Sequence, residues 1–347
     1  MKTKPSVLLT GASGTVGYEV LQQLLAADTC ELFVFDIKTP RTEKLFSAFA
    51  QNIHLIYGNI ANGADVARIP LGMDMVIHLA AIIPPTADQK PNLAWKVNVN
   101  GTRNLVFHLE MTSPRAFLLF SSSVAVYGDR LHNPHIKVGD ELRCSTGDLY
   151  AQTKVECERI VQQSDVKWSI FRLTAIMRNH KISPLMFHMP LSTLMEICTP
   201  EDTARAFVKA LERQTELCGK VYNLGGGKDC LITYRDFLIR SFKMYGLGKL
   251  NFPENAFAEH NFHCGIFSDG DKLENLLHFR HDNLDTYFAY TRKHIPRWLY
   301  VLAVVFRMPV KLYLLLYSEP YRAYISHNKG QMQRFFFAPK QIVMPKL

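Results

Sequence analysis

The stretch SVLLTGASGTVGYE at Ser6–Glu19 decides the fold of this chain. Its apolar run ends at Thr10, three glycines follow at a spacing of three (Gly11, Gly14 and Gly17), and a helical pattern begins behind them. A chain that turns sharply from a buried strand into a helix needs glycine for the turn and for close approach of a ligand to the backbone. The free N–H groups and positive dipole of the first helical turn suit a pyrophosphate. The stretch therefore predicts a dinucleotide site, with an ordinary glycine-rich turn as the alternative.

Asp36 supports this prediction. It ends a second apolar run, ELFVFD at Glu31–Asp36, at the distance from the glycines where an acidic residue binds the adenosine ribose. A carboxylate there accepts from a free ribose 2′-hydroxyl and repels a 2′-phosphate, so NAD is favoured over NADP. The nearby Lys38 and Arg41 act against that preference.

Apolar runs alternate with helical patterns through the first half of the chain, which is typical of a parallel sheet with helices on both faces. We expect strands at Val7–Thr10, Leu32–Asp36, Ile53–Tyr57, Met75–Leu79, Phe117–Ser121, Trp168–Leu173 and Val221–Leu224. We expect helices at Val16–Ala27, Arg41–Ala50, Leu93–Leu109, Asp148–Gln163 and Pro200–Arg213. The predicted fold class is α/β, a doubly wound parallel sheet with a small discontinuous cap lobe and a helical C-terminal tail.

The 347 residues are enough for a large core and a second, smaller lobe. We assign residues 1–175 and 201–225 to the dinucleotide-binding domain, residues 176–200 and 226–291 to the cap lobe, and residues 292–347 to the tail. The cap lobe is expected over the carboxyl ends of the strands, where open parallel sheets bind their ligands.

Tyr150 and Lys154 stand four residues apart in DLYAQTKVECERI, so both project from one face of a helix. A phenol is a poor base at neutral pH, but an ammonium one turn away favours the phenolate, which makes Tyr150 a candidate general acid/base. The alternative is a surface Tyr/Lys pair. In FSSSVAVYG at Phe120–Gly128, Ser123 follows a buried strand. There it can hydrogen-bond a substrate oxygen, or simply cap a turn.

Together these motifs resemble the extended short-chain dehydrogenase/reductase family, the NAD-dependent epimerase/dehydratase group, which has a Rossmann fold. The resemblance runs in chain order through TGASGTVG, VIHLAA (Val76–Ala81), VNVNGT (Val97–Thr102), FSSSVAVYG, YAQTK, TPEDTARA and VYNLGGG. The combination is far more specific than any one motif.

The resemblance implies the roles of individual residues. Tyr150 would be the catalytic acid/base, Lys154 its partner and a ligand of the nicotinamide ribose, and Ser123 the hydroxyl that orients the substrate. Cofactor contacts are implied at Gly11, Gly14, Thr15, Val16, Gly17, Asp36, Asn59, Ile60, Leu79, Ala80, Ala81, Asn98, Tyr150, Lys154 and Thr174. Asn98 is also expected to brace the central helix, and a homodimer through residues 93–109 and 148–163 is implied.

The resemblance implies an NAD-dependent oxidoreductase that transfers hydride between the nicotinamide and a hydroxyl or ketone. Asn59 replaces the aspartate usual in the family, but its amide oxygen can still accept from the adenine amine, so cofactor binding should survive. Sugar-nucleotide members often have an asparagine where this chain has Ala175. The segment Met177–Thr199, where the chain leaves the predicted sheet before the helix at Pro200–Arg213, is short. It therefore offers few residues to bind a nucleotide diphosphate. We therefore favour an apolar, steroid- or isoprenoid-like substrate. A sugar-nucleotide epimerase/dehydratase and a non-catalytic NAD-sensing scaffold at a membrane stay as alternatives.

The loop Ile82–Pro85, which reads IIPP, offers either an apolar wall for such a substrate or a prolyl loop packed on the cap lobe. His260, His263 and Cys264 in HNFHCG, like His278 and His281, have the spacing of metal ligands. We expect no metal site, because no acidic or thiolate companions complete a set of four ligands.

The composition indicates a cytoplasmic protein. Seven cysteines without a paired motif suggest reduced thiols, and the apolar run at the N-terminus is too short for a secretory signal. The sequence contains no uninterrupted run of about 18 apolar residues, so we expect no membrane-spanning helix.

The tail carries all the excess charge. From Arg292 to Leu347 there are ten Lys/Arg and one acidic residue, a net charge of +9 that equals that of the whole chain. Ile295–Tyr317 interleaves basic, aromatic and apolar residues, a pattern that suits a helix lying in an anionic membrane interface. The alternative is a tail packed on the body or on a second subunit. Nucleic acid is not expected as a partner, because no recognised nucleic-acid-binding fold accompanies the charge.

Overall fold

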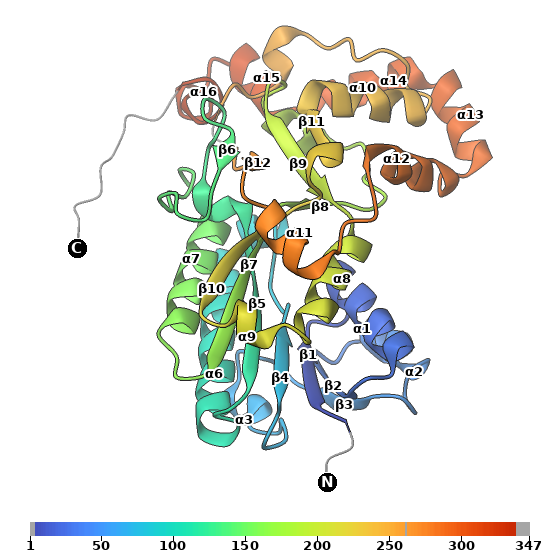
Figure 1. Ribbon diagram of the computed structural model, residues 1–347. Helices are drawn as coiled ribbons and strands as arrows, with labels where there is room; N and C mark the ends of the chain where they lie inside the picture. Colours follow the sequence, from blue (N-terminus) through green and yellow to red (C-terminus); the bar gives the residue numbers. More distant parts are fainter. Residues whose placement is uncertain (1–3, 261, 338–347) are drawn as a thin grey trace.

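Seven parallel strands form the central sheet of the computed structural model, which describes residues 4–260 and 262–337 (Figure 1). The sheet has the order β10-β7-β5-β4-β1-β2-β3. Its strands are β1 (Ser6–Thr10), β2 (Glu31–Asp36), β3 (His54–Tyr57), β4 (Met75–His78), β5 (Phe117–Ser123), β7 (Lys167–Leu173) and β10 (Lys220–Leu224). The chain winds in one direction from β1 to β3 and in the other from β4 onward. A crevice is therefore expected outside the carboxyl ends of β1 and β4.

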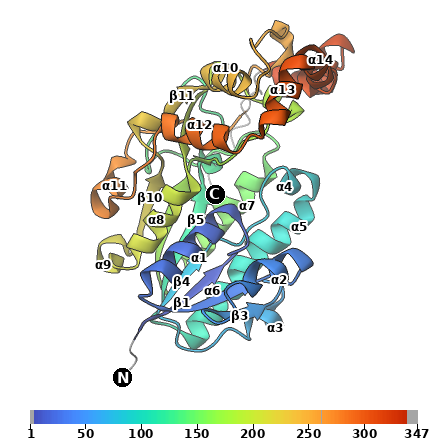
Figure 2. The same cartoon turned by 90° about the vertical axis from the view of Figure 1, so that its right-hand side faces the viewer.

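Helices cover both faces of this sheet (Figures 1 and 2). One face packs against α1 (Thr15–Ala27), α2 (Pro40–Ser47), α8 (Pro200–Ala210), α9 (Gln214–Leu217) and α11 (Asp271–Leu277). The other face packs against α3 (Gly63–Val66), α6 (Gly101–Thr112) and α7 (Leu149–Gln162). Two apolar cores result, one on each face, as the fully buried strands require.

The cap lobe lies beyond the carboxyl ends of the strands (Figure 1). It contains a sheet of β8 (Ala175–Ile176), β9 (Leu194–Cys198) and β11 (Leu231–Thr233), with α10 (Tyr234–Met244) and α12 (Leu284–Lys293). A separate pair joins β6 (His135–Ile136) to β12 (Ile266–Phe267). Short helices α4 (Thr86–Gln89) and α5 (Pro91–Trp95) precede the long α6.

The tail is helical, as predicted: α13 (Arg297–Val305), α14 (Arg307–Leu316), α15 (Glu319–Ile325) and α16 (Lys329–Phe336). Its end packs on the cap lobe, where Phe335 joins Ala258 and Ala323 in a buried cluster and its carbonyl accepts from Glu259 N at 2.8 Å. For α15 and α16, the alternative that the tail packs on the body of the protein is therefore confirmed. Residues 338–347 of the predicted tail lie outside the described residues.

The predicted sheet is confirmed, and each of the seven predicted strands begins and ends within two residues of an observed strand. The helix predicted at Leu93–Leu109 is confirmed as one continuous helical stretch, in which a π-helical segment, Lys96–Asn100, joins α5 to α6. Helices α2 and α8 end three residues earlier than predicted, at Ser47 and Ala210.

The predicted boundaries of the cap lobe differ from the structure at two places. Residues 271–279 were assigned to the cap lobe, but Leu273, Leu277 and Phe279 belong to the apolar core shared by α1 and α8. The tail was expected to begin at Arg292, which lies in the last turn of α12.

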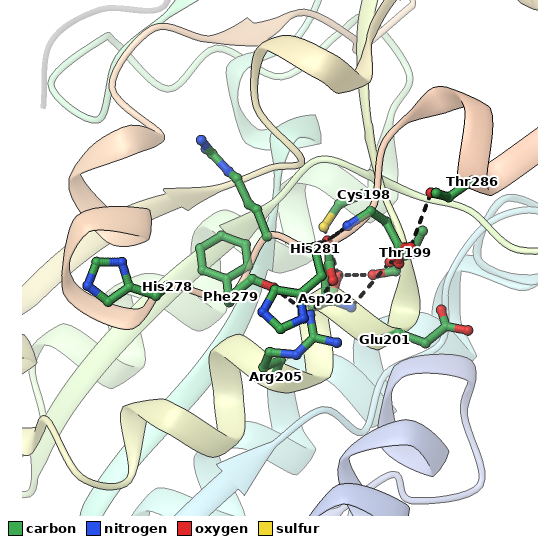
Figure 3. A network of polar contacts seen from close by, with 12 residues as sticks. Cys198, Thr199, Glu201, Asp202, Arg205, His278, Phe279, His281 and Thr286 are labelled. Atoms are coloured by element: carbon green, nitrogen blue, oxygen red, sulfur yellow. Dashed lines mark hydrogen bonds and ion pairs between the residues drawn. The ribbon is translucent and has the colours of Figure 1, made fainter.

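Asp202 on α8 holds the chain where it returns from α11 to α12 (Figure 3). Its Oδ2 accepts from the backbone N–H groups of His281 and Asp282, both at 2.9 Å, and Arg205 donates to Phe279 O at 2.6 Å. The rings of His278 and His281 point to different sides in Figure 3. No group of three or more potential metal ligands was found among the described residues.

His78, at the end of β4, is buried beneath the glycine turn. Its Nδ1 lies 2.7 Å from Thr10 Oγ1 and its Nε2 lies 3.0 Å from Thr102 Oγ1. The Thr102 hydroxyl donates to Asn98 O at 2.6 Å, so Nε2 carries the proton and Nδ1 accepts. Burial, helped by the charge of Lys154, lowers the pKa of His78 to about 3.

This lowered pKa predicts a loss of stability in acid. Below about pH 6.5 the unfolded histidine binds a proton that the folded one excludes, so the free energy of unfolding falls by up to about 1.4 kcal/mol per pH unit until the folded pKa is reached. His78→Gln should remove about that slope between pH 6.5 and 4 in urea unfolding curves. The matched control is His132→Gln at an exposed position. Equal slopes in the wild type and His78→Gln would contradict the assignment.

Candidate active site

The glycine turn between β1 and α1 is built for close approach of backbones. Gly11 has a φ of +74°, and a Cβ there would lie 2.6 Å from Ala80 N. A Cβ at Gly17 would overlap Gly11 O, so α1 can begin directly on the turn. The N-cap of α1 is Gly14, and its first turn holds no acidic residue. A side chain at Gly11 or Gly17 would push the neighbouring backbone segments apart and distort the turn. Thr15 and Val16 lie in the first helical turn, as predicted.

Asp36 ends β2 beside this turn and is almost fully buried. Its carboxylate accepts from Ser13 N at 2.8 Å, Ser13 Oγ at 3.1 Å and Ile37 N at 2.8 Å. Burial raises the pKa of Asp36, while those hydrogen bonds and the charge of Arg41 oppose the shift. Two carboxylate oxygens can accept further bonds from ribose hydroxyls next to the turn. The residues present therefore fit the adenosine half of a dinucleotide.

Asn59 and Ile60 follow β3 at the neighbouring strand end. Asn59 is exposed, and its Oδ1 accepts from Ala61 N at 3.0 Å. Ile60 is buried in the core against Gly101, so its side chain is unable to flank an adenine as predicted. Its carbonyl accepts from Asn104 Nδ2 at 3.0 Å. Asn59 and Ile60 can therefore contact the cofactor only through the Asn59 side chain and through their backbone atoms.

The residues after β4 lie opposite the glycine turn. Leu79, Ala80 and Ala81 are half-buried, with Leu79 N bonded to Thr10 O at 3.2 Å. Asn98 is different, because its buried side chain is fully engaged by the protein. Its Oδ1 accepts from Ile82 N at 2.7 Å, and its Nδ2 donates to Ile82 O and to Thr153 Oγ1, both at 3.0 Å. Asn98 thus braces the loop after β4 against α7. Its predicted contact with the cofactor stays a prediction.

Tyr150, Lys154 and Ser123 meet where α7 crosses the end of β5. The Ser123 hydroxyl lies close enough to the Tyr150 phenol to affect its pKa, and it accepts a hydrogen bond from Ala125 N at 3.2 Å. Lys154 Nζ donates to Ser121 O at 2.8 Å and lies 5.9 Å from the centre of the Tyr150 ring. The structure therefore brings together the three residues predicted to be catalytic.

The electrostatics of this group differ from the sequence-based expectation. Burial raises the pKa of Tyr150, and the neighbouring Ser123 hydroxyl opposes the shift only in part. Burial also lowers the pKa of Lys154. The predicted lowering of the phenol pKa by Lys154 is wrong for this structure, since the ammonium turns to Ser121 O. Tyr150 is a protonated phenol across the neutral range, which suits it to donate a proton.

A buried polar network behind these residues escaped the sequence analysis. Ser122 Oγ donates to Glu158 at 2.5 Å, and Arg172 donates to both oxygens of the same carboxylate at 2.9 and 2.7 Å. Arg172 also donates to Tyr127 OH at 2.7 Å, and that hydroxyl donates to Asn223 at 2.8 Å. The sequence motifs that contain these residues are FRL at Phe171–Leu173 and YG at Tyr127–Gly128. Neither motif indicates that Arg172 and Tyr127 contact each other or Glu158.

A cavity of about 360 Å³ lies between the end of β5 and the cap lobe, with Ser123 in its wall. Its lining is mostly apolar: Val124, Ala175, Met177, Ile182, Leu185, Met186, Met189, Met195, Phe237, Leu238 and Phe262. Among the described lining residues, Lys181 is the single Lys or Arg. The cavity therefore suits an apolar molecule with one oxygen at Ser123.

Two sequence-based predictions concern residues near this cavity. Thr174 lines the cavity, and its hydroxyl donates to Glu196 O at 2.7 Å, while its predicted contact with the cofactor stays a prediction. Within the described structure, no residue of the Ile82–Pro85 loop lines the cavity. Ile82 instead packs beside Tyr150, and Ile83 is exposed. The apolar wall comes from the cap lobe.

A larger cavity, of about 710 Å³, lies at the opposite edge of the sheet, where Pro5 and Asp74 precede β1 and β4. None of the residues predicted to be catalytic lines it. We place the candidate site at the carboxyl edge.

Comparisons with known proteins agree with this geometry. The sequence model of the NAD dependent epimerase/dehydratase family matches residues 7–192. A 3-beta-hydroxysteroid dehydrogenase of Mycolicibacterium neoaurum is 33% identical over 163 residues, which cover 45% of this chain and 42% of that protein. The N-acetyl-alpha-D-glucosaminyl-diphospho-ditrans,octacis-undecaprenol 4-epimerase of Escherichia coli O157:H7 is 35% identical over 133 residues, which cover 37% and 35% of the two chains. The matches thus span less than half of these relatives.

Solved structures share the fold over a longer stretch. The UDP-glucuronic acid 4-epimerase from Bacillus cereus, in complex with UDP-glucuronic acid and NAD, superposes with a TM-score of 0.68 at 19% identity and covers 84% of this chain and 100% of that one. The dTDP-glucose 4,6-dehydratase DesIV from Streptomyces venezuelae gives 0.67 at 20% identity, covering 88% and 99%. At such identities the comparison establishes the Rossmann fold alone.

The crowded glycine turn generates a prediction. Gly11→Ala places a Cβ against the Ala80 backbone at a φ that L-residues rarely adopt, so NAD should bind at least about ten-fold more weakly in calorimetric titration. Gly63→Ala is the matched control, because a Cβ there meets no atom within 4 Å in the described structure. Unchanged NAD affinity in a folded Gly11→Ala variant would show that the dinucleotide binds elsewhere.

Proposed function

Because the chain belongs to the NAD dependent epimerase/dehydratase family, we propose that it is an NAD-dependent oxidoreductase acting on an apolar alcohol or ketone. The observation that carries this proposal is the cavity in which a mostly apolar cap-lobe wall ends at Ser123, whose hydroxyl lies beside the Tyr150 phenol. The substrate class we propose is steroid- or isoprenoid-like. The similarity to a 3-beta-hydroxysteroid dehydrogenase over part of the chain supports that class.

NAD would be held by the Gly11–Gly17 turn and by Asp36, and it supplies the acceptor or donor of hydride when bound. Ser123 would bind the substrate oxygen. Tyr150 would give its phenolic proton to that oxygen in reduction and take it back in oxidation. Lys154 would hold the nicotinamide ribose and place a positive charge beside the phenolate that forms. The buried setting keeps water away from the proton that moves between Tyr150 and the substrate.

A sugar-nucleotide epimerase or dehydratase is the second candidate, favoured by the similarity to the undecaprenol 4-epimerase. Two negative phosphates need basic partners, and Lys181 is the single Lys or Arg among the described cavity residues. NADH absorbance followed against sterols, long-chain isoprenoid alcohols and nucleotide sugars separates the two candidates. Turnover of nucleotide sugars alone, by a protein purified with bound NAD, would overturn our proposal.

A homodimer through α6 and α7 is proposed as well. Phe107 and Met111, on α6, are 64% and 70% exposed, which is unusual for large apolar side chains on a helix of a monomer.

A cytoplasmic location is proposed from the seven cysteines, all of which are free.

The raised pKa of Tyr150 predicts different pH profiles for the two directions of reaction. Below that pKa the phenol is protonated, so reduction should change little between pH 6 and 8. Oxidation needs the phenolate, whose fraction grows up to ten-fold per pH unit, so kcat for oxidation should rise with pH. Initial rates in both directions test this. Tyr150→Phe should lower both rates by at least about 100-fold. A variant that kept the alkaline rise would rule out Tyr150 as the acid/base.

Asp36 predicts the choice of cofactor. Asp36→Asn keeps hydrogen-bond acceptors beside Ser13 but removes the charge that repels a 2′-phosphate, so the ratio of kcat/KM for NAD to that for NADP should fall at least about ten-fold. Glu43→Gln is the control, since Glu43 pairs with Lys38 at 3.3 Å near the same strand end. An unchanged ratio in Asp36→Asn would mean that other residues select the cofactor.

A further inference from the structure

Helices α13 and α14 expose an unusual amount of apolar surface. None of the described residues of α13 is buried, and α14 buries only Lys311 and Leu314. The exposed large apolar side chains of the pair and its flanks are Trp298, Leu299, Val301, Leu302, Val304, Val305, Phe306, Met308, Leu312, Tyr313, Leu316 and Tyr317. We call this set the apolar face. Contiguous apolar patches of this extent mark an interaction site on a folded protein.

The two helices are firmly seated, so the apolar face is a feature of the fold. Tyr300, Ala303, Val310 and Leu315 pack against the buried apolar cluster of the cap lobe. Lys311 Nζ donates to Lys249 O and to Asn251 Oδ1, both at 2.6 Å. The opposite sides of α13 and α14 are the ones left exposed. In Figure 2 the two helices project at the outer corner of the cap lobe, away from the central sheet.

The charged residues along α13 and α14 themselves are all basic. Between Arg292 and Tyr317 the sequence contains no aspartate or glutamate. Arg292, Lys293, Arg297 and Arg307 are exposed at the helix ends, whereas Lys311 is turned inward. Trp and Tyr among the exposed side chains add the aromatic residues typical of a membrane–water interface. A basic rim around an apolar, aromatic centre is complementary to an anionic lipid surface.

The geometry favours lying on a bilayer over crossing it. No single helix among the described residues is long and apolar enough to span a membrane. Arg297–Val305 and Arg307–Leu316 reach that length together, but they meet at 78°. A spanning arrangement would also place the exposed Arg307, at the bend, in the hydrocarbon region, which is costly. In the plane of the interface the same arginine reaches the lipid headgroups.

We propose that α13 and α14 dock this protein on anionic phospholipid bilayers, with the apolar face inserted at the level of the headgroups and upper acyl chains. The apolar cluster on which α13 and α14 pack also contains Met186, Met195 and Phe237 of the cavity wall. The cap lobe would then stand between the bilayer and the candidate active site. An apolar substrate could reach the cavity from the lipid phase, a consequence that rests on the proposed function.

Flotation of the full-length protein with vesicles tests the docking directly. Binding should be strong to vesicles of phosphatidylcholine with about a third phosphatidylserine, and should weaken at least ten-fold on pure phosphatidylcholine. Val305→Glu, at a position 67% exposed, should weaken binding to the anionic vesicles at least ten-fold. Leu71→Glu is the matched control: Leu71 is 73% exposed, far from the cap lobe, and its replacement should leave binding unchanged.

Three results would overturn the proposal: no flotation of the wild type, equal flotation of Val305→Glu, or a dimer in sedimentation analysis that Val305→Glu dissociates without any lipid binding. The last would assign the apolar face to a second copy of the chain. NAD affinity, measured in parallel on each variant, should not change. The test can therefore reject lipid docking while the proposed oxidoreductase function stands. It can equally support lipid docking when the oxidoreductase function is rejected.

Discussion

Three contacts fix helix α7 to the carboxyl end of strand β5, and the candidate site depends on them. Successive serines of the strand each meet a different turn of the helix: Ser123 lies beside Tyr150, the Ser121 carbonyl accepts from Lys154, and the Ser122 hydroxyl donates to Glu158. Positions 150, 154 and 158 lie on one face of α7 because they are four apart. The register of one helix on one strand thus places the acid/base, the ammonium and a structural carboxylate at once.

This arrangement buries charged side chains, and the hydrogen bonds and ion pair around them offset the cost of removing them from water. Lys154 and Glu158 are almost inaccessible to water, as is Arg172, which binds both oxygens of Glu158. Removing one member of a buried ion pair costs about 3–5 kcal/mol, because the other charge is left without a partner. Helix α7 is therefore held in register before any ligand arrives. The same burial raises the pKa of Tyr150, so the geometry that positions the phenol also sets its protonation state.

The sequence predicted those parts of the molecule that depend on local pattern. The parallel sheet follows from uninterrupted apolar runs, and the glycine turn from three glycines between a strand and a helix. The cavity wall could not be predicted, because Met177, Met195 and Phe237 come from segments that meet only through long-range packing. For the Ile82–Pro85 loop the sequence left an apolar wall and a packed prolyl loop as equal alternatives, and Ile82 packs beside Tyr150. The direction of the Lys154 ammonium was missed for a similar reason: helical spacing gives its face, but not the carbonyl it finds there.

The central claim is that a protonated, buried phenol works beside a dinucleotide held on the glycine turn. A crystal structure of the protein with NAD and an apolar alcohol tests it most directly. We predict that the pyrophosphate lies over Gly11–Gly17 and that the alcohol oxygen is within hydrogen-bonding distance of both Tyr150 and Ser123. A dinucleotide bound elsewhere, or an alcohol that leaves Tyr150 without contact, would contradict the account.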